Sequence, residues 1–218
     1  MKHNCFISFK KEDTYYKNEI SKKLCDDRLQ GKSLDKWIDS DDIDYVMQVI
    51  RSQYMKNTSV TLFLIGRHSS ENEGYQYSFK DGYYYNKQNF IIRELKATLY
   101  DGKGNRRSGL LGIVLPDMYD TIYGGSYICS HCGKIINLVK IDPSTVIKEF
   151  SENYYLNPNC DDGHCDESGR FCVLVRYDDF MKDPDKYINE AYDKTSSAIN
   201  KFVHWRDIDR TYKKKSLY

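Results

Sequence analysis

Short apolar runs, separated by longer stretches with helical periodicity, constrain the fold of this chain more than any other feature of its 218 residues. The clearest run, S-V-T-L-F-L-I at residues 59–65, contains β-branched residues and is followed by a glycine. Strands that are apolar without interruption are typical of parallel sheets covered by helices on both faces. The sequence predicts five such strands, at residues 5–9, 33–38, 59–65, 109–115 and 171–177.

Stretches with the period of an amphipathic helix alternate with these strands. They lie at residues 13–25, 43–54, 89–100 and 185–203. The alternation predicts an α/β fold of the flavodoxin-like type, with a parallel five-stranded sheet in the order 2-1-3-4-5 and helices on both faces. We expect a single domain over residues 1–218, with residues 117–170 as a Cys-rich insertion between strands four and five.

Open sheets of this kind bind ligands outside the carboxyl ends of their strands. In the predicted topology, that edge is formed by residues 8–11, 39–42 and 66–68 and by the start of the helix at 89–100. Five residues there are candidates for ligand binding: Phe9, Lys10, Asp39, Gly66 and Phe90.

The helix at residues 89–100 reads N-F-I-I-R-E-L-K-A-T-L-Y. At 3.6 residues per turn, most of its apolar side chains gather on one arc that we expect to face the sheet. Its other polar and basic residues are predicted to face solvent on the opposite side: Arg93, Lys96 and Tyr100.

Glu94 does not lie with those polar residues. It falls at the edge of the apolar arc, between Phe90 and Thr98, and no Lys or Arg stands three or four positions away along the helix. Two interpretations are open at this point. Glu94 is either a rim residue that reaches water, or a partly desolvated carboxylate of the kind that enzymes use in catalysis.

Three classes of protein that share this architecture carry motifs that this chain lacks. The first strand is followed by Lys10 and Lys11, where a phosphoacceptor receiver needs an acidic pair. No hydroxyl- and glycine-rich loop follows that strand, which excludes a flavodoxin phosphate loop. The sequence G-K-G-N at residues 102–105 follows a helix, not a strand, so it predicts a turn and not a dinucleotide fingerprint.

Four segments resemble a fourth class, the TIR domains. F-I-S-F-K-K-E-D at residues 6–13 resembles their first-strand signature, and F-I-I-R-E at residues 90–94 resembles their aromatic-x-x-x-Glu helix. S-V-T-L-F-L-I-G at residues 59–66 and G-L-L-G-I-V-L-P at residues 109–116 are most similar to the bacterial TIR-like proteins of Thoeris-type antiphage defence. The resemblance covers residues 3–116. Phe90 stands where many relatives carry Trp. Phenylalanine keeps an aromatic wall at this position but lacks the indole N–H.

This resemblance implies an enzyme that cleaves NAD, its substrate, at the nicotinamide–ribose bond, with Glu94 as the catalytic carboxylate. Water as acceptor would give ADP-ribose. A ribose hydroxyl of the same molecule would give a cyclic ADP-ribose isomer, the kind of second messenger through which defence relatives activate a separate effector protein. Phe9 and Phe90 would stack on the rings of NAD, and Lys10 would meet its pyrophosphate. The alternative is a non-catalytic TIR interaction module that assembles, for example as a homo-oligomer, through the faces of the domain.

The predicted insertion carries two close cysteine pairs, Cys129 with Cys132 and Cys160 with Cys165. Four thiolates at such spacing suit a structural, tetrahedral zinc ion, and His131 or His164 could replace one of them. The alternative is that these are loop cysteines without a metal. With four protein ligands, such a zinc would stabilise the insertion and leave no open position for catalysis.

The charge and hydropathy of the chain disfavour two classes of partner. A formal net charge of +1 gives no electrostatic footprint for nucleic acid, and no apolar stretch approaches membrane-spanning length. The N-terminal residues do not resemble a signal peptide. We therefore expect a cytoplasmic protein whose seven cysteines are reduced thiols or metal ligands.

Overall fold

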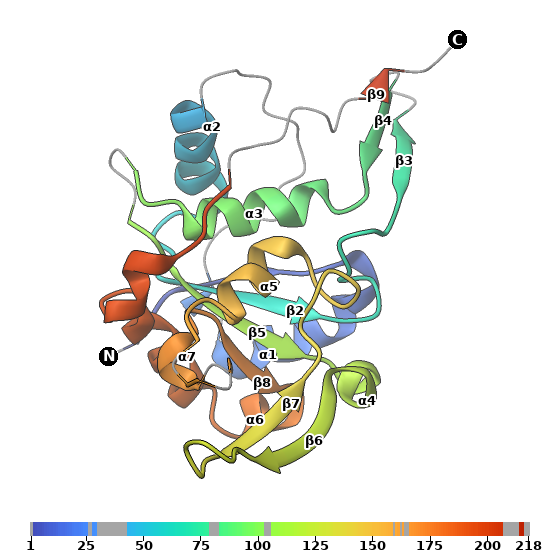
Figure 1. The fold of residues 1–218 in the computed structure, drawn as a ribbon. Helices are drawn as coiled ribbons and strands as arrows, with labels where there is room; N and C mark the ends of the chain where they lie inside the picture. The colour runs from blue at the N-terminus through green and yellow to red at the C-terminus, as the bar shows by residue number, and fades with distance from the viewer. Residues whose placement is uncertain are drawn as a thin grey trace.

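The computed structural model describes residues 2–25, 28–29, 43–78, 83–102, 106–158, 160–161, 163, 166–206 and 214–215. Its centre is a parallel four-stranded sheet in the order β1-β2-β5-β8 (Figure 1). The strands are β1 Cys5–Ser8, β2 Val60–Ile65, β5 Gly109–Val114 and β8 Val173–Arg176. They correspond to predicted strands one, three, four and five in the predicted order, and the α/β class is confirmed.

Predicted strand two, residues 33–38, lies outside the described residues. Leu29, shortly before it, forms a parallel bridge with Cys5 of β1. Because Cys5 also pairs with Val60 of β2, Leu29 must lie along the opposite edge of β1. That is the edge to which the predicted order assigns strand two.

Helices cover both faces of the sheet (Figure 1). One face carries α2 Ile43–Val49, α3 Asn89–Leu99 and α5 Lys148–Tyr154, and the other carries α1 Thr14–Leu24, α6 Tyr177–Lys182 and α7 Pro184–Lys194. Alternate residues of each strand serve the two faces, as strand geometry requires. Phe63 and Ile65 pack with α3 and α5, whereas Leu62 and Leu64 pack with α1 and α7.

Shorter helical segments connect these elements. They are η1 Lys11–Asp13, η3 Ile50–Tyr54, η4 Pro116–Met118, α4 Tyr119–Ile122, η5 Glu167–Gly169 and η6 Ala198–Phe202. Every helix in the described part of the chain is too short or too polar to cross a bilayer.

The predicted helix at residues 185–203 is divided in the structure. α7 ends at Lys194, and η6 follows after a run of hydroxyl residues. Thr195 Oγ1 donates to the Tyr192 carbonyl at 2.7 Å, and Ser197 Oγ donates to the Lys194 carbonyl at 2.9 Å. Such local side-chain hydrogen bonds compete with helix continuation, which explains the break.

The segment between β2 and α3 contains a hairpin that the sequence did not predict. Its strands, β3 Tyr75–Ser78 and β4 Tyr83–Asn86, are antiparallel, and β9 Lys214–Lys215 pairs with β4. In Figure 1 the hairpin projects beyond the end of α3, away from the central sheet. It thereby extends the carboxyl edge of the sheet with residues that can line a site.

The predicted insertion at residues 117–170 also contributes to the core. It forms the antiparallel hairpin β6 Tyr123–Ile128 and β7 Ile135–Val139, followed by α5. Val146, Ile147 and Phe150 are fully buried in the cluster that contains Phe63 of β2. Part of the insertion therefore covers the sheet directly.

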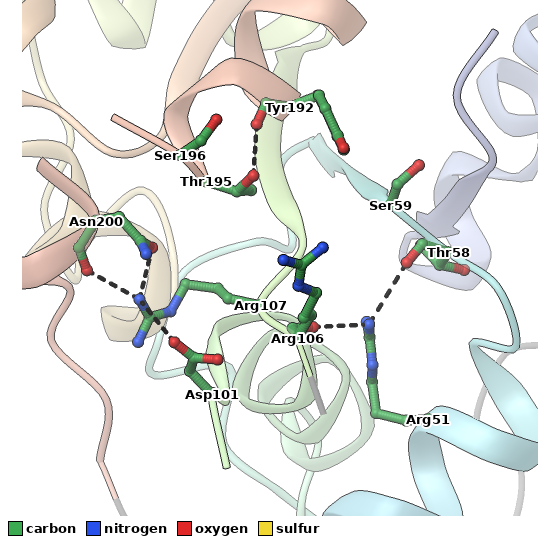
Figure 2. Close-up of a pocket in the computed structure, with 10 residues that line it drawn as sticks. All are labelled: Arg51, Thr58, Ser59, Asp101, Arg106, Arg107, Tyr192, Thr195, Ser196 and Asn200. Atoms are coloured by element: carbon green, nitrogen blue, oxygen red, sulfur yellow. Dashed lines mark hydrogen bonds and ion pairs between the residues drawn. The ribbon is translucent and has the colours of Figure 1, made fainter. Parts of the chain in front are cut away.

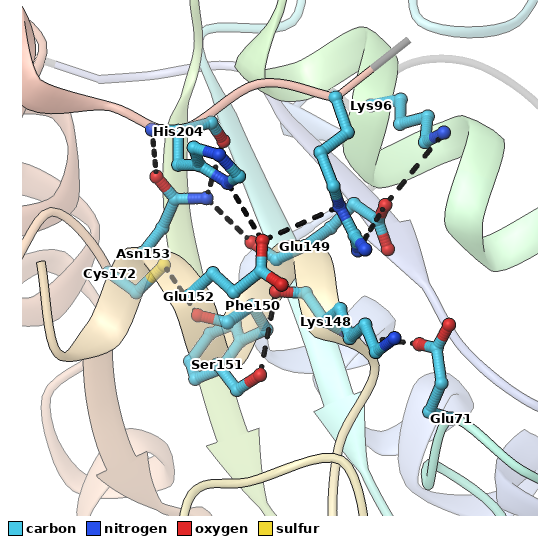
Figure 3. Close-up of polar contacts among 11 residues, drawn as sticks. Glu71, Lys96, Lys148, Glu149, Phe150, Ser151, Glu152, Asn153, Cys172 and His204 are labelled. Carbon is cyan, nitrogen blue, oxygen red and sulfur yellow. Dashed lines mark hydrogen bonds and ion pairs between the residues drawn. The ribbon is translucent and has the colours of Figure 1, made fainter. Parts of the chain in front are cut away.

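The prediction that Arg93 and Lys96 face solvent is wrong, because each side chain is only 3% exposed. A second layer encloses α3: Trp205 donates its indole N–H to the Lys96 carbonyl at 3.0 Å. Lys96 Nζ also lies 4.0 Å from a Glu149 oxygen of α5, which accepts from Arg206 at 3.0 Å. Figure 3 shows Lys96 of α3 and Glu149 of α5 with their side chains pointing toward one another. Ion pairing offsets the cost of burying these charges.

Candidate active site

Glu94 lies on α3 where the helix passes the carboxyl end of β1. Its side chain is 2% exposed, so the interpretation of a rim residue reaching water is wrong. Ser8, the buried last residue of β1, donates its hydroxyl to Glu94 Oε2 at 2.7 Å. Thr98 fixes the same helix by sharing a 2.7 Å hydrogen bond with Thr61 of β2. The carboxylate is thus held in one orientation by the sheet beneath it.

A pocket of about 530 Å³ opens beside this carboxylate. That volume is within the range of roughly 300–1,000 Å³ that is common for small-molecule sites. The structure brings together there four of the predicted site residues: Phe9, Lys10, Phe90 and Glu94. The rest of the described lining consists of Lys11, Glu12, His68, Glu73, Gln76, Lys87 and Ile91.

The two aromatic residues of the pocket are each half-buried. Phe9 packs partly against the cluster on the α1 side of the sheet, and Phe90 lies 6.4 Å from the Tyr85 ring, centroid to centroid. Both rings therefore combine a packed side with a surface toward the pocket. Half-buried aromatic rings of this kind can stack on a planar heterocycle.

Lys10 is anchored across the pocket by the segment that precedes α3. Its ammonium donates to the Lys87 carbonyl at 3.0 Å and to Gln88 Oε1 at 2.9 Å. Burial lowers the pKa of Lys10, and the charge of Glu12 partly opposes that effect. An ammonium has three N–H donors, so these two contacts leave one for a ligand.

The loop after β2 supplies pocket residues beyond the five candidates for ligand binding. His68 Nδ1 lies 3.0 Å from Glu73 Oε2, and Gln88 Nε2 donates to the His68 carbonyl at 2.7 Å. His68 lies within residues 66–68 of the predicted ligand-binding edge, whereas no motif in the sequence indicated Glu73. The β3–β4 hairpin adds Gln76.

The two remaining candidates for ligand binding are not in the described pocket lining. Asp39 lies outside the described residues. Gly66 permits a close approach instead: a Cβ there would lie 2.5 Å from Asp13 Oδ1. The buried Asp13 carboxyl is the reason for a glycine at this turn. Burial, together with the charges of Asp117 and Glu12, raises the pKa of Asp13 to about 6.

Three of the four predicted metal ligands lie together at the end of the β6–β7 hairpin. The sulfur atoms of Cys129, Cys132 and Cys160 are all within 4.8 Å of one another, and those of Cys129 and Cys160 are 3.8 Å apart. Thiolates bound to tetrahedral zinc at about 2.3 Å are separated by roughly 3.8 Å, so this geometry fits the ion. A hydrogen bond from the Lys134 backbone lowers the pKa of Cys132. Cys165 lies outside the described residues.

A comparison with protein families gives one match. Residues 6–96 match the family described as Thoeris protein ThsB, TIR-like domain. The matched segment runs from β1 into α3 and includes all the predicted ligand-binding residues and Glu94. A comparison with curated proteins gives no match.

Proposed function

We propose that this chain, whose residues 6–96 match the Thoeris ThsB TIR-like domain family, cleaves NAD at the nicotinamide–ribose bond. The observation that carries the proposal is the position of Glu94. Its carboxylate is buried yet borders a pocket that also presents two aromatic rings and a lysine. The volume of that pocket is large enough for a nicotinamide and its ribose.

Glu94 would act on the bond between ribose C1′ and the nicotinamide nitrogen. As that bond breaks, its electron pair leaves with nicotinamide, which departs as a neutral molecule, while the ribose gains oxocarbenium character. A carboxylate held beside C1′ stabilises the positive charge that grows in this transition state. The Ser8 hydroxyl, by donating to Oε2, fixes the direction of the carboxylate before the reaction.

The acceptor step needs a proton to be removed from a hydroxyl group. The same Glu94 carboxylate can take that proton as the oxygen attacks C1′. Water gives ADP-ribose, and a hydroxyl of the same molecule gives a cyclic isomer. We propose the cyclic isomer as the main product and a separate effector protein as its receiver, because that is what the Thoeris resemblance implies.

Phe9, Phe90 and Lys10 would bind the substrate. The exposed parts of the two rings suit stacking on nicotinamide or adenine, and the third N–H donor of Lys10 suits a pyrophosphate oxygen. His68 and Glu73, paired at 3.0 Å, also line the pocket and are further candidates for substrate contact.

The test is to incubate the full chain with NAD and separate the products by chromatography. We expect nicotinamide together with a cyclic ADP-ribose isomer. Glu94→Gln should slow nicotinamide release at least about 100-fold, the effect of removing a catalytic carboxylate. Glu190→Gln, which changes a partly buried carboxyl on α7 that borders a different pocket, should leave the rate unchanged. Nicotinamide release that survives Glu94→Gln would contradict the assignment.

A non-catalytic interaction module is the second candidate. The β6–β7 hairpin favours it, because Ile128 and Ile135, which pair in register, are 70% and 71% exposed. Exposed apolar side chains of this size often lie at protein contacts. This function predicts concentration-dependent assembly in sedimentation, no nicotinamide release at any concentration, and loss of assembly on Ile135→Asp.

We also propose that the cysteine cluster holds a structural zinc ion, with Cys165 as its fourth ligand. Purified protein should contain about one zinc per chain by elemental analysis, and Cys132→Ser should lose it. Cys25→Ser changes an exposed cysteine outside the cluster and should retain it. A chelator should lower the melting temperature of the wild type but not of Cys132→Ser. Zinc content that is independent of Cys132 would contradict this assignment.

A further inference from the structure

A second pocket lies at the end of the sheet opposite Glu94. It has a volume of about 480 Å³ and is lined by residues that precede β2 and β5, with others from η3, η6 and the end of α7 (Figure 2). β2 has six residues and so spans roughly 20 Å between the two ends. The two pockets share no described lining residue. A ligand in one therefore does not occupy the other.

Arginine dominates the charge of this pocket. Its described lining contains Arg51, Arg106 and Arg107 but only one acidic residue, Asp101, which gives a local charge of 3 − 1 = +2. This is a concentration of positive charge in a chain whose net charge is +1. Guanidinium groups match the geometry of phosphate oxygens and can donate to them in pairs.

Two of the arginines are fixed in place by uncharged acceptors. Arg107 donates from Nε to the Leu99 carbonyl at 2.7 Å and from Nη1 to Asn200 Oδ1 at 2.6 Å. Arg51 donates to Ser108 Oγ at 2.7 Å and to the Arg106 carbonyl at 3.0 Å. The carboxylate of Asp101 lies 3.9 Å from Arg107 Nη1. Among the described contacts of Arg107, none employs Nη2, whose two donors can face a ligand.

Arg106 is exposed, and Figure 2 shows its guanidinium extending into the middle of the group of lining residues. Within the described part of the chain, no side-chain acceptor is paired with it. Burial lowers the pKa of Arg51 and of Arg107, as expected for guanidinium groups removed from water. An anion placed between the three arginines would offset that cost.

We propose that this pocket binds a phosphate-bearing small molecule, with Arg106 as its main contact and Arg107 and Arg51 as supporting contacts. The volume of the pocket suits a small ligand, and a net charge of +1 gives the chain no electrostatic footprint for nucleic acid. The inference stands on this pocket alone and holds whether or not the chain cleaves NAD.

The probe is inorganic pyrophosphate, titrated calorimetrically into the full-length chain at constant ionic strength. We expect one saturable site. Arg106→Ala should weaken binding at least about tenfold, the loss expected for one charge-assisted contact. The matched control is Arg67→Ala, which removes an exposed arginine beside Asp117 and should leave the affinity unchanged. Lys10→Ala distinguishes the two pockets, because Lys10 can affect only a pyrophosphate bound beside Glu94.

Four results would overturn the proposal. Equal weakening by Arg106→Ala and Arg67→Ala would mean non-specific attraction to surface charge. Weakening by Lys10→Ala alone would place pyrophosphate in the Glu94 pocket. Tighter, Arg106-dependent binding of a single-stranded oligonucleotide would assign the surface to nucleic acid. The absence of saturable binding would likewise exclude a phosphate site.

Discussion

Ser8 is the residue on which the orientation of Glu94 depends. It belongs to the short run that the sequence identified as strand one, yet nothing in the sequence indicated that its hydroxyl reaches a residue 86 positions away. The contact arises because β1 ends where α3 crosses the sheet. Ser8 is therefore a positioning residue, and it acts on the reaction through Glu94.

Replacing Ser8 with alanine should lower the turnover of NAD about tenfold while leaving KM almost unchanged. The lost hydrogen bond contributes about 1.5–3 kcal/mol when its acceptor is charged, and part of that should be recovered by water. The measurement is steady-state nicotinamide release. Ser151→Ala removes a buried hydroxyl whose one recorded contact, with the Lys148 carbonyl, is 3.5 Å long, and it should have no effect. A change confined to KM would contradict the positioning role.

Asp13 makes the stability of the protein fall as the pH rises, which is opposite to the effect of most carboxylates. Its pKa is about 6 in the folded chain and 3.8 without burial, so the folded state binds the proton more tightly. The free energy of unfolding therefore falls as the pH rises from about 4 to 6. Asp13→Asn should remove this dependence and stabilise the protein at pH 7 by about 1–2 kcal/mol.

Urea unfolding of Asp13→Asn and wild type at pH 4 and pH 7 tests this expectation. The difference in the free energy of unfolding between the two proteins should be small at pH 4 and large at pH 7. Asp142→Asn provides a control of opposite sign, because hydrogen bonds from Ser144 lower the pKa of Asp142. A stability difference for Asp13→Asn that does not vary with pH would contradict the account.

The sequence predicted those pocket residues that lie in local motifs. Phe9 and Lys10 follow the first strand, Phe90 and Glu94 lie in the helix motif at residues 90–94, and the structure places all four around one pocket. The prediction for Arg93 and Lys96 failed for a physical reason. Helical periodicity detects the side of α3 that faces the sheet, but it cannot detect a second layer formed by α2 and the distant Trp205.

At the scale of elements, unbroken apolar runs were reliable because parallel strands are buried on both faces. Elements with mixed composition were missed. The β3–β4 hairpin is rich in tyrosine and polar residues, and α5 follows a polar stretch of the insertion. Both pack through contacts distant in sequence, which a local pattern does not contain.

Close packing of α7 on β5 depends on Gly109. A Cβ there would lie 2.2 Å from the backbone oxygen of Ala191, and a backbone atom cannot rotate away. Gly109→Ala should therefore destabilise the chain by about 2–3 kcal/mol. Gly124→Ala, on the exposed β6 strand where the nearest atom lies at 3.6 Å, is the control and should change stability little. Equal melting temperatures for the two variants would contradict this packing.

At the scale of the whole molecule, the parallel sheet separates two sites of different charge. The Glu94 pocket at the carboxyl end mixes lysines with glutamates, whereas the pocket at the amino end is dominated by arginine. The second half of α3 connects the two pockets. Glu94 lies in the middle of this helix, and Arg107 donates to the carbonyl of its last residue, Leu99. A net charge near zero therefore conceals a clear division of charge between the two ends.

The central claim is that Glu94 performs chemistry on NAD and does not merely bind it. It is tested most directly by measuring NAD affinity and nicotinamide release side by side for wild type and Glu94→Gln. The account predicts NAD affinities within about threefold of each other and nicotinamide release only by the wild type, because glutamine keeps the shape of the side chain but not its charge. Equal nicotinamide release by the two proteins, or release by neither, would contradict it.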